Sequence, residues 1–81
     1  MKIYYSSKFE KEYKKLPKKV KDLAEEKEKV FRKDPFTPSL KSHKLTGKLK
    51  NYWSFSINYE YRIIFEFAGK DLIWFHSVGT H

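Results

Sequence analysis

Apolar residues recur at the spacing of a helical stripe in the first part of the chain, after a short run of strand-forming residues. Residues 2–5 carry isoleucine and tyrosine and predict a first strand. Phe9, Tyr13 and Leu16 then fall on one face of a helix, and Pro17 interrupts the stripe. The stripe resumes at Val20, Leu23, Ala24, Lys27, Val30 and Phe31, with the alkyl part of Lys27 on the stripe and its ammonium group reaching solvent. Because proline is well tolerated in the first turn of a helix, we predict two helices joined tightly as an antiparallel hairpin.

The first helix has a capping signal at its start. Ser6 and Ser7 follow the predicted strand, and a serine hydroxyl in this position accepts a hydrogen bond from an unpaired backbone amide. Glu10 lies three residues after Ser7, which is the spacing of a capping box. We therefore predict that the helix begins at these serines, with Ser7 and Glu10 forming the box.

The helical period is lost at residues 34–38, where two prolines exclude a continuing helix. Loop character then runs on through Gly47. Beyond it the period becomes two, because apolar and polar residues alternate over 53–57 and again over 61–67, with a short connection at 58–60. These two segments predict an antiparallel pair of strands.

A last apolar segment follows a turn at residues 68–71. Residues 72–78 are apolar on both faces, which is typical of a central strand that is covered on each side. The predicted order is β-α-α-β-β-β, an α+β fold in which the helical hairpin packs on one face of a C-terminal antiparallel meander. No repeat, linker or low-complexity segment divides residues 1–81, so we expect a single domain.

The charge of the chain favours a polyanionic partner. Eighteen lysines and arginines against ten acidic residues give a net charge of +8. Within residues 41–50, Lys41, Lys44, Lys48 and Lys50 occur without any acidic residue. Such a cluster suits a nucleic acid, and RNA or DNA is the leading class of ligand. The alternative is that the lysines only keep a small protein in solution.

The chain has no cysteine, so neither a disulfide nor a thiolate metal site can reinforce it. Aromatic residues, 19% of the chain, are expected to compensate by building the core. The first residues lack the apolar stretch of a signal peptide, and no segment is long and apolar enough to span a membrane. We therefore expect a cytoplasmic protein that has no membrane partner.

Familiar metal and cofactor motifs are absent from the sequence. His43, His76 and His81 lack the spacing of metal ligands, and the three glycines are isolated rather than grouped in a phosphate-binding loop. No nucleophile triad is recognisable either. We expect no metal ion and no cofactor, which leaves the polar residues within and between the strands as candidates for function.

Arg62 lies inside an apolar strand and is one of only two arginines in a lysine-rich chain, the other being Arg32. A guanidinium presents a rigid fork of donors that matches a phosphate, which an ammonium group does not. The alternative is a structural arginine paired with Glu66 or Glu60 on the sheet surface. Arg62 is therefore the first candidate for a phosphate-binding residue.

Other polar residues are candidates that each have a structural alternative. An imidazole can donate or accept a proton during catalysis, which makes His81 a candidate, although a terminal histidine is commonly disordered. His43 in the basic loop and Glu60 in a turn are either acid–base groups or inert surface residues. His76 lies within a strand and is expected to be a packed structural residue. Phosphate contacts and base stacking are expected from Lys44, Lys48, Lys50, Tyr52 and Tyr59.

Several of the candidate residues occur in a recognisable order along the chain. The segments concerned are His43-Lys44-Leu45-Thr46-Gly47, Tyr52-Trp53-Ser54, Ile57-Asn58, Tyr61-Arg62-Ile63-Ile64-Phe65 and Gly79-Thr80-His81. Together they resemble the RelE/ParE toxin superfamily, and within it the YafQ-like and YoeB-like mRNA interferases. The pattern Phe9-x-x-x-Tyr13-x-x-Leu16 of the first helix also fits, so the resemblance covers nearly the whole chain. No single motif is decisive, but their order and spacing together are specific. The resemblance implies a RelE-like fold with a curved sheet.

The resemblance also implies a type II toxin that cleaves messenger RNA in the ribosomal A site, by attack of a 2′-hydroxyl on the adjacent phosphate. Arg62 matches a strand arginine of YoeB-like members and would stabilise the charge of the phosphorane. His81 matches a terminal histidine of YafQ-like members and would be the general acid, with Glu60 or His43 as the base. This chemistry requires no metal ion.

Two features depart from the family pattern. Ser56 stands where relatives often carry a histidine or an arginine, so Lys48 and Lys50 are expected to supply part of the positive charge. Relatives also usually continue for several residues beyond the position of His81. The place of His81 in the site therefore depends most on the tertiary structure.

Finally, the resemblance implies a cognate antitoxin that holds the toxin inactive in a hetero-oligomer. We expect an acidic antitoxin segment that folds on the basic surface. Two other functions stay open at this point, a ParE-like inhibitor of DNA gyrase and a noncatalytic nucleic-acid-binding module. Neither has much need for the polar set His43, Glu60, Arg62 and His81.

Overall fold

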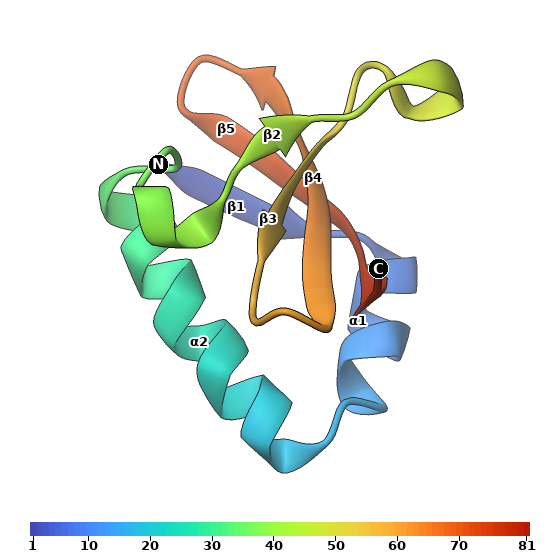
Figure 1. Ribbon diagram of the computed structural model, residues 1–81. Coiled ribbons are helices and arrows are strands. Elements are labelled where there is room, and N and C mark those ends of the chain that lie inside the picture. Colours follow the sequence, from blue (N-terminus) through green and yellow to red (C-terminus); the bar gives the residue numbers. More distant parts are fainter.

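The computed structural model describes residues 1–81 and places two helices on one face of a five-stranded sheet (Figure 1). Its elements are β1 (Lys2–Tyr5), α1 (Ser7–Lys14), α2 (Lys18–Lys33), the 3₁₀ turn η1 (Pro38–Leu40), β2 (His43–Lys44), the 3₁₀ turn η2 (Gly47–Leu49), β3 (Trp53–Ser56), β4 (Tyr61–Gly69) and β5 (Leu72–Thr80). The strand order across the sheet is β1-β5-β4-β3-β2, with β1 parallel to β5 and the other neighbours antiparallel. Neither helix combines the length and the apolar character needed to cross a membrane. The predicted α+β order and the C-terminal meander are confirmed.

The short strand β2 occupies part of the segment that the sequence pattern assigned to a loop. His43 and Lys44 pair with Ser54 and Trp53 along one edge of β3. Two residues are too few to produce an alternating pattern, and a distant segment supplies their ladder partners. The prediction of a loop up to Gly47 is therefore wrong at these two residues.

Ser6, rather than Ser7, caps α1. The Ser6 hydroxyl accepts a hydrogen bond from the backbone amide of Phe9 at 3.0 Å and donates one to the carbonyl of His76 at 2.8 Å. The predicted box of Ser7 and Glu10 does not form, because Ser7 is already the first helical residue. One hydroxyl thus joins the start of α1 to β5, a contact that the local sequence does not reveal.

Replacing Ser6 by alanine is expected to lower the free energy of unfolding by about 1–2 kcal/mol, because the cap and the bond to β5 are both lost. Ser7→Ala is the matched control, and we expect it to change this free energy by less than about 0.5 kcal/mol. Urea unfolding followed by circular dichroism measures both values. Equal losses for the two variants would contradict the assignment of the cap.

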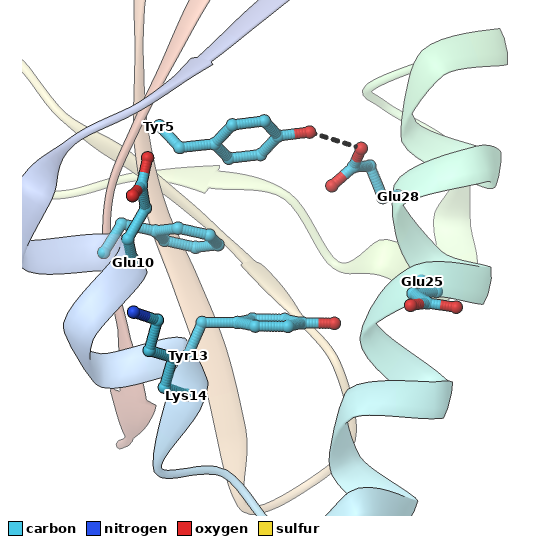
Figure 2. Close-up of a pocket in the computed structure, with 7 residues that line it drawn as sticks. Tyr5, Glu10, Tyr13, Lys14, Glu25 and Glu28 are labelled. Carbon is cyan, nitrogen blue, oxygen red and sulfur yellow. Dashed lines mark hydrogen bonds between the residues drawn. The ribbon is translucent and has the colours of Figure 1, made fainter.

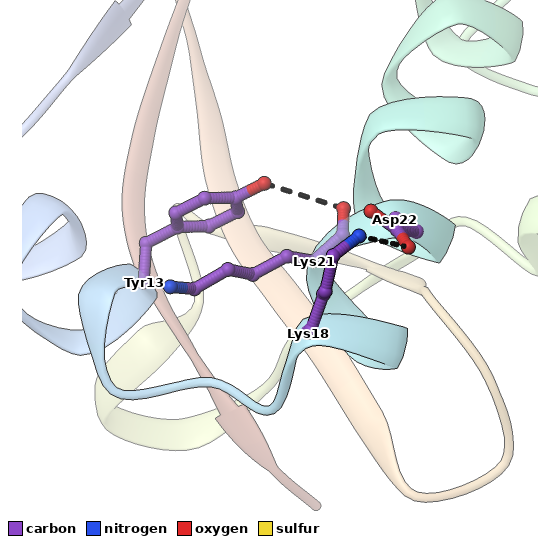
Figure 3. A network of polar contacts seen from close by, with 4 residues as sticks. All are labelled: Tyr13, Lys18, Lys21 and Asp22. Atoms are coloured by element: carbon purple, nitrogen blue, oxygen red, sulfur yellow. Dashed lines mark hydrogen bonds and ion pairs between the residues drawn. The ribbon is translucent and has the colours of Figure 1, made fainter.

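Pro17 separates the two helices, as predicted. α2 begins directly after it, and the hydroxyl of Tyr13 donates a hydrogen bond to the backbone carbonyl of Lys21 at 3.3 Å (Figure 3). Lys18 and Asp22 form an ion pair at 3.3 Å across one turn of α2. From this connection the helices diverge (Figure 1), and α1 packs beside β5. The hairpin is therefore open, and each helix makes its own contacts with the sheet.

The core lies between the helices and the face of the sheet turned toward them, the inner face. Phe31 of α2 is fully buried, and its ring centroid lies 4.9 Å from those of Phe55 and Phe65 and 5.5 Å from that of Phe75. The other buried apolar residues are Phe9, Leu16, Val20, Ala24, Leu40, Ile57, Ile63, Ile73 and Val78. One helix side chain thus contacts three strands, and aromatic rings fill the centre of the core as their abundance predicted.

The face of the sheet turned away from the helices, the outer face, carries no second layer (Figure 1). Residues of β5 that alternate with the core, such as Trp74 and His76, are only partly buried. The prediction that residues 72–78 are covered on each side is therefore wrong for this face. The exposed and partly exposed side chains of the outer face are therefore accessible to other molecules.

Candidate functional site

Arg62 lies on the outer face, on the central strand of the meander. Its cross-strand partners are Ser56 on β3 and Gly79 on β5. Arg62 is half-buried and takes part in none of the four ion pairs of the molecule, so the alternative pairing with Glu66 or Glu60 is not observed. An arginine on an open face without a carboxylate partner can direct its N–H donors to an anionic ligand.

Open space lies beside Arg62, because both of its cross-strand partners are small. A Cβ atom added at Gly79 would meet no atom within 4 Å. Gly79 does not adopt the left-handed conformation that requires glycine, so the missing side chain alone creates this gap. A phosphate group can therefore approach the guanidinium from the outer face.

His81 extends the ladder between β4 and β5 by one step. Its backbone amide donates a hydrogen bond to the carbonyl of Glu60 at 3.1 Å. His81 follows Gly79 by two residues, so strand alternation puts it on the same face as Arg62, at a diagonal separation of roughly 7–8 Å. Both His81 and Glu60 are exposed. Arg62 and His81 are thus diagonal neighbours at one end of the outer face, and Glu60 is the backbone partner of His81 there.

His43 lies on the same face but two strands away from β4. It pairs with Ser54 of β3, and the usual strand spacing puts it roughly 10 Å from β4. Its side chain is exposed, and its Nδ1 lies 3.1 Å from the carbonyl oxygen of Lys41. A ligand that extends from Arg62 across β3 would reach His43.

The lysines of the predicted RNA-binding set do not gather around Arg62. Lys44 pairs with the inward-facing Trp53, while Lys48 and Lys50 lie in and directly after η2. η2 and the β3–β4 hairpin lie at opposite ends of β3, which spans about 10 Å (Figure 1). Lys44 and Lys50 line an open hollow of about 500 Å³ there. Lys48 and Lys50 are therefore placed to contact a phosphate remote from Arg62, rather than to replace the charge missing at Ser56.

The two tyrosines proposed for base stacking lie at different ends of the sheet. Tyr59 lies in the β3–β4 connection and is 93% exposed. Tyr52 precedes β3, and its ring centroid lies 4.8 Å from that of His76. Tyr59 thus lies near the end of the sheet that carries Arg62, whereas Tyr52 belongs to the other end.

His76 lies within β5 on the outer face, where it is partly exposed and packs against the rings of Tyr52 and Trp74. Its Nε2 lies 2.8 Å from a carboxylate oxygen of Glu66, and the two side chains are 30% and 33% exposed. An irregularity in the β4–β5 ladder leaves His76 without a cross-strand partner, so alternation along the sequence did not reveal its surroundings. Together with His43 and His81 it forms no cluster, and no three histidine, aspartate or glutamate side chains are arranged to hold a metal ion.

A hollow between α1 and α2 is acidic (Figure 2). It is lined by Tyr5, Phe9, Glu10, Tyr13, Lys14, Glu25 and Glu28. The Tyr5 hydroxyl donates a hydrogen bond to the Glu28 carboxylate at 2.7 Å, and burial together with Glu28 raises the pKa of Tyr5. Burial, followed by the charges of Glu25 and Glu28, likewise raises the pKa of Tyr13. Negative potential in this hollow disfavours a phosphate, so the outer face is the better candidate for a nucleic-acid site.

Comparison with known proteins agrees with the resemblance seen in the sequence. A family model described as YafQ, a bacterial toxin of type II toxin–antitoxin systems, matches residues 1–81. YafQ from E. coli strain BL21(DE3) has a similar structure, with a TM-score of 0.82 and 24% identity over 99% of this chain and 92% of that chain. No match is found among curated proteins.

Two solved toxin–antitoxin complexes contain similar chains. The E. coli DinJ–YafQ complex gives a TM-score of 0.75 and 27% identity, over 99% of this chain and 91% of that chain. The YoeB–YefM complex from Staphylococcus aureus gives a TM-score of 0.80 and 25% identity, over 100% of this chain and 97% of that chain. The fold is therefore shared across YafQ and YoeB toxins, and the family match extends over the full length. This chain belongs to the YafQ family of bacterial toxins of type II toxin–antitoxin systems.

Proposed function

We propose that this toxin is a ribosome-dependent endoribonuclease that cleaves messenger RNA in the A site of cytoplasmic ribosomes. The observation that carries the proposal is the unpaired guanidinium of Arg62 on the open face of the sheet, beside the gap at Gly79. His81 follows on the same face, within reach of a phosphate bound at Arg62. A gyrase inhibitor or a passive binding module has little need for a titratable group next to an unpaired cation.

In the proposed reaction a general base removes the proton of a 2′-hydroxyl, and the 2′-oxygen attacks the adjacent phosphorus. A bond forms between phosphorus and this oxygen, and the bond to the 5′-oxygen breaks. The leaving 5′-oxygen takes up a proton from the general acid. The products are a 2′,3′-cyclic phosphate and a 5′-hydroxyl, and no metal ion or redox partner is needed to balance the steps.

The residues around Arg62 can be assigned to these steps. Arg62 would bond two nonbridging oxygens and stabilise the negative charge that develops on the phosphorane. His81 would donate the proton to the leaving oxygen, and Glu60 or His43 would accept the proton of the 2′-hydroxyl. Glu60 is next to His81 in the ladder, whereas His43 would act from across β3.

We further propose that an acidic antitoxin segment covers the outer face and holds the toxin inactive. Similar chains occur in the DinJ–YafQ complex and in a heterotetrameric YoeB–YefM complex. The chain carries a net charge of +8, and its unpaired Arg62 lies on the uncovered face of the sheet. An acidic segment would be attracted to this charge and would block access to Arg62.

A toeprint assay on programmed ribosomes tests the nuclease proposal. Wild-type protein is expected to cut messenger RNA within the A-site codon and to leave a 2′,3′-cyclic phosphate, which end-specific labelling detects. Intact messenger RNA, together with inhibition of gyrase supercoiling in a parallel assay, would overturn the proposal in favour of a ParE-like activity.

Filling the gap beside Arg62 is expected to block the substrate without disturbing the fold. Gly79→Leu should lower the rate of messenger RNA cleavage about tenfold or more, because the new side chain displaces the phosphate from the guanidinium. The unfolding midpoint should not fall, since a Cβ atom at this position meets no atom within 4 Å and glycine is unfavourable within a strand. Thr80→Leu, on the other face of the same strand, is the control and should cleave normally. Normal cleavage by Gly79→Leu would place the substrate elsewhere.

A further inference from the structure

Four aromatic rings form a continuous row across the outer face, away from Arg62. From β1 to β3 they belong to Tyr4, Trp74, His76 and Tyr52, which we term the aromatic row. The ring centroids of Tyr4 and Trp74 lie 5.3 Å apart, those of Trp74 and His76 6.3 Å, and those of His76 and Tyr52 4.8 Å. Tyr4 is the cross-strand partner of Trp74, and both point away from the core.

The aromatic row belongs to the surface of the protein rather than to its core. Tyr4 is 46% exposed, and the other three side chains are partly exposed on a face that has no covering layer. Aromatic rings on an open sheet are platforms on which the bases of a single-stranded nucleic acid stack, since every base has a π-face.

Cations flank both ends of the aromatic row. Lys2 precedes Tyr4 by two residues and therefore shares its face of β1. At the other end, Lys50 lines the hollow that begins just before Tyr52. A phosphate backbone can contact these ammonium groups while its bases lie on the rings. This combination favours single-stranded RNA over an apolar protein surface, which would leave the flanking cations unpaired.

Glu66 adds a means of selecting among bases. It pairs with Trp74 across the β4–β5 ladder, so its carboxylate lies beside the rings. One carboxylate oxygen of Glu66 is hydrogen-bonded to His76 Nε2 at 2.8 Å, and the other oxygen takes part in no hydrogen bond. A carboxylate accepts a hydrogen bond from the amino group of cytosine but has no donor for the carbonyl that uracil carries at the same position.

We propose that the aromatic row stacks a base of single-stranded RNA and that Glu66 selects an amino-bearing base over uracil. The proposal extends the proposed nuclease function by giving its substrate a second subsite. Glu66 lies four residues from Arg62 along β4, or roughly 13 Å. The selected base is therefore a neighbour of the cleaved step and not the cleaved nucleotide itself.

The two tryptophans allow the subsite to be tested by fluorescence. Trp53→Phe leaves Trp74 as the only reporter, whereas Trp74→Phe leaves Trp53, which pairs with the buried Phe65 on the inner face. Short 2′-O-methyl oligocytidine and oligouridine are the probes, because they cannot be cleaved. Oligocytidine should quench Trp74 and bind about three- to tenfold more tightly than oligouridine, while Trp53 should not respond.

Variants separate stacking from base selection. Glu66→Gln should bring the affinity ratio of the two oligonucleotides close to one, whereas Glu25→Gln on α2 should leave it unchanged. Tyr4→Leu should lower the affinity for both oligonucleotides to a similar extent, because leucine keeps an apolar contact but removes part of the stacking surface. An equal response of Trp53, or an unchanged ratio in Glu66→Gln, would overturn the proposal.

The binding readout does not depend on catalysis, so the two proposals fail separately. Quenching of Trp74 without any cleavage on ribosomes would contradict the proposed nuclease function and support the RNA subsite. Cleavage on ribosomes without quenching of Trp74 would support the nuclease function and contradict the proposed subsite.

Discussion

Arg62→Ala is expected to lower the rate of messenger RNA cleavage on ribosomes about 10²–10³-fold, the usual effect of removing one donor that stabilises a transition state. The physical reason is the isolation of this group. Arg62 forms no ion pair, and the lysines in and directly after η2 lie at the other end of β3, so these lysines cannot replace its stabilisation of the developing phosphorane charge.

The other arginine provides the matched control. Arg32 lies on α2 and bonds the Glu28 carboxylate at 3.3 Å, on the helix side of the molecule. Arg32→Ala should cleave at the wild-type rate, and Arg62→Lys should be intermediate because a lysine keeps the charge but loses the fork of donors. Single-turnover cleavage assays measure all three variants. Similar cleavage rates for Arg62→Ala and Arg32→Ala, with both proteins folded, would contradict the assignment of Arg62 as the central group of the proposed site.

Phe31→Ala is expected to cost about 3–5 kcal/mol of the free energy of unfolding, the usual range for deleting a buried phenylalanine. Phe31 has no exposed surface and contacts rings from three strands, so its loss opens a cavity at the centre of the core. A chain of this length has a total stability of about 4–12 kcal/mol, so the variant should be largely or partly unfolded at 37 °C.

Phe36→Ala is the comparison, because the Phe36 side chain is 53% exposed at the end of the loop after α2. We expect it to cost about 1 kcal/mol, mainly from its contacts with Trp53 and Phe67. Urea unfolding monitored by circular dichroism gives both free energies. Comparable losses for Phe31→Ala and Phe36→Ala would mean that the core is not organised around α2.

Local patterns in the sequence determined the elements of this protein. The spacing of Phe9, Tyr13 and Leu16 predicted α1, Pro17 predicted the break before α2, and the change to a period of two predicted the C-terminal meander. These predictions succeed because helix and strand periods follow from backbone geometry over a few residues. The sequence also marked Arg62 as unusual, since a charged residue within an apolar strand needs either a partner or a ligand.

Tertiary structure alone decided which of the candidate residues meet. The ladder between β4 and β5 set Gly79 beside Arg62 and brought His81 to Glu60, while the length of β3 kept Lys48 and Lys50 away. Strand register depends on hydrogen bonds between segments far apart in the chain, and a one-residue irregularity changes every later partner.

The same physical reason explains the predictions that were wrong. Ser6 rather than Ser7 caps α1 because its hydroxyl also reaches β5, and β2 exists because the edge of β3 supplies its partners. His76 lies on an open face because both helices cover the other side of the sheet. The sequence alone thus determined the periods of its elements and the presence of an arginine within a strand, whereas long-range hydrogen bonding and packing decided which face stayed uncovered and which residues gathered on it.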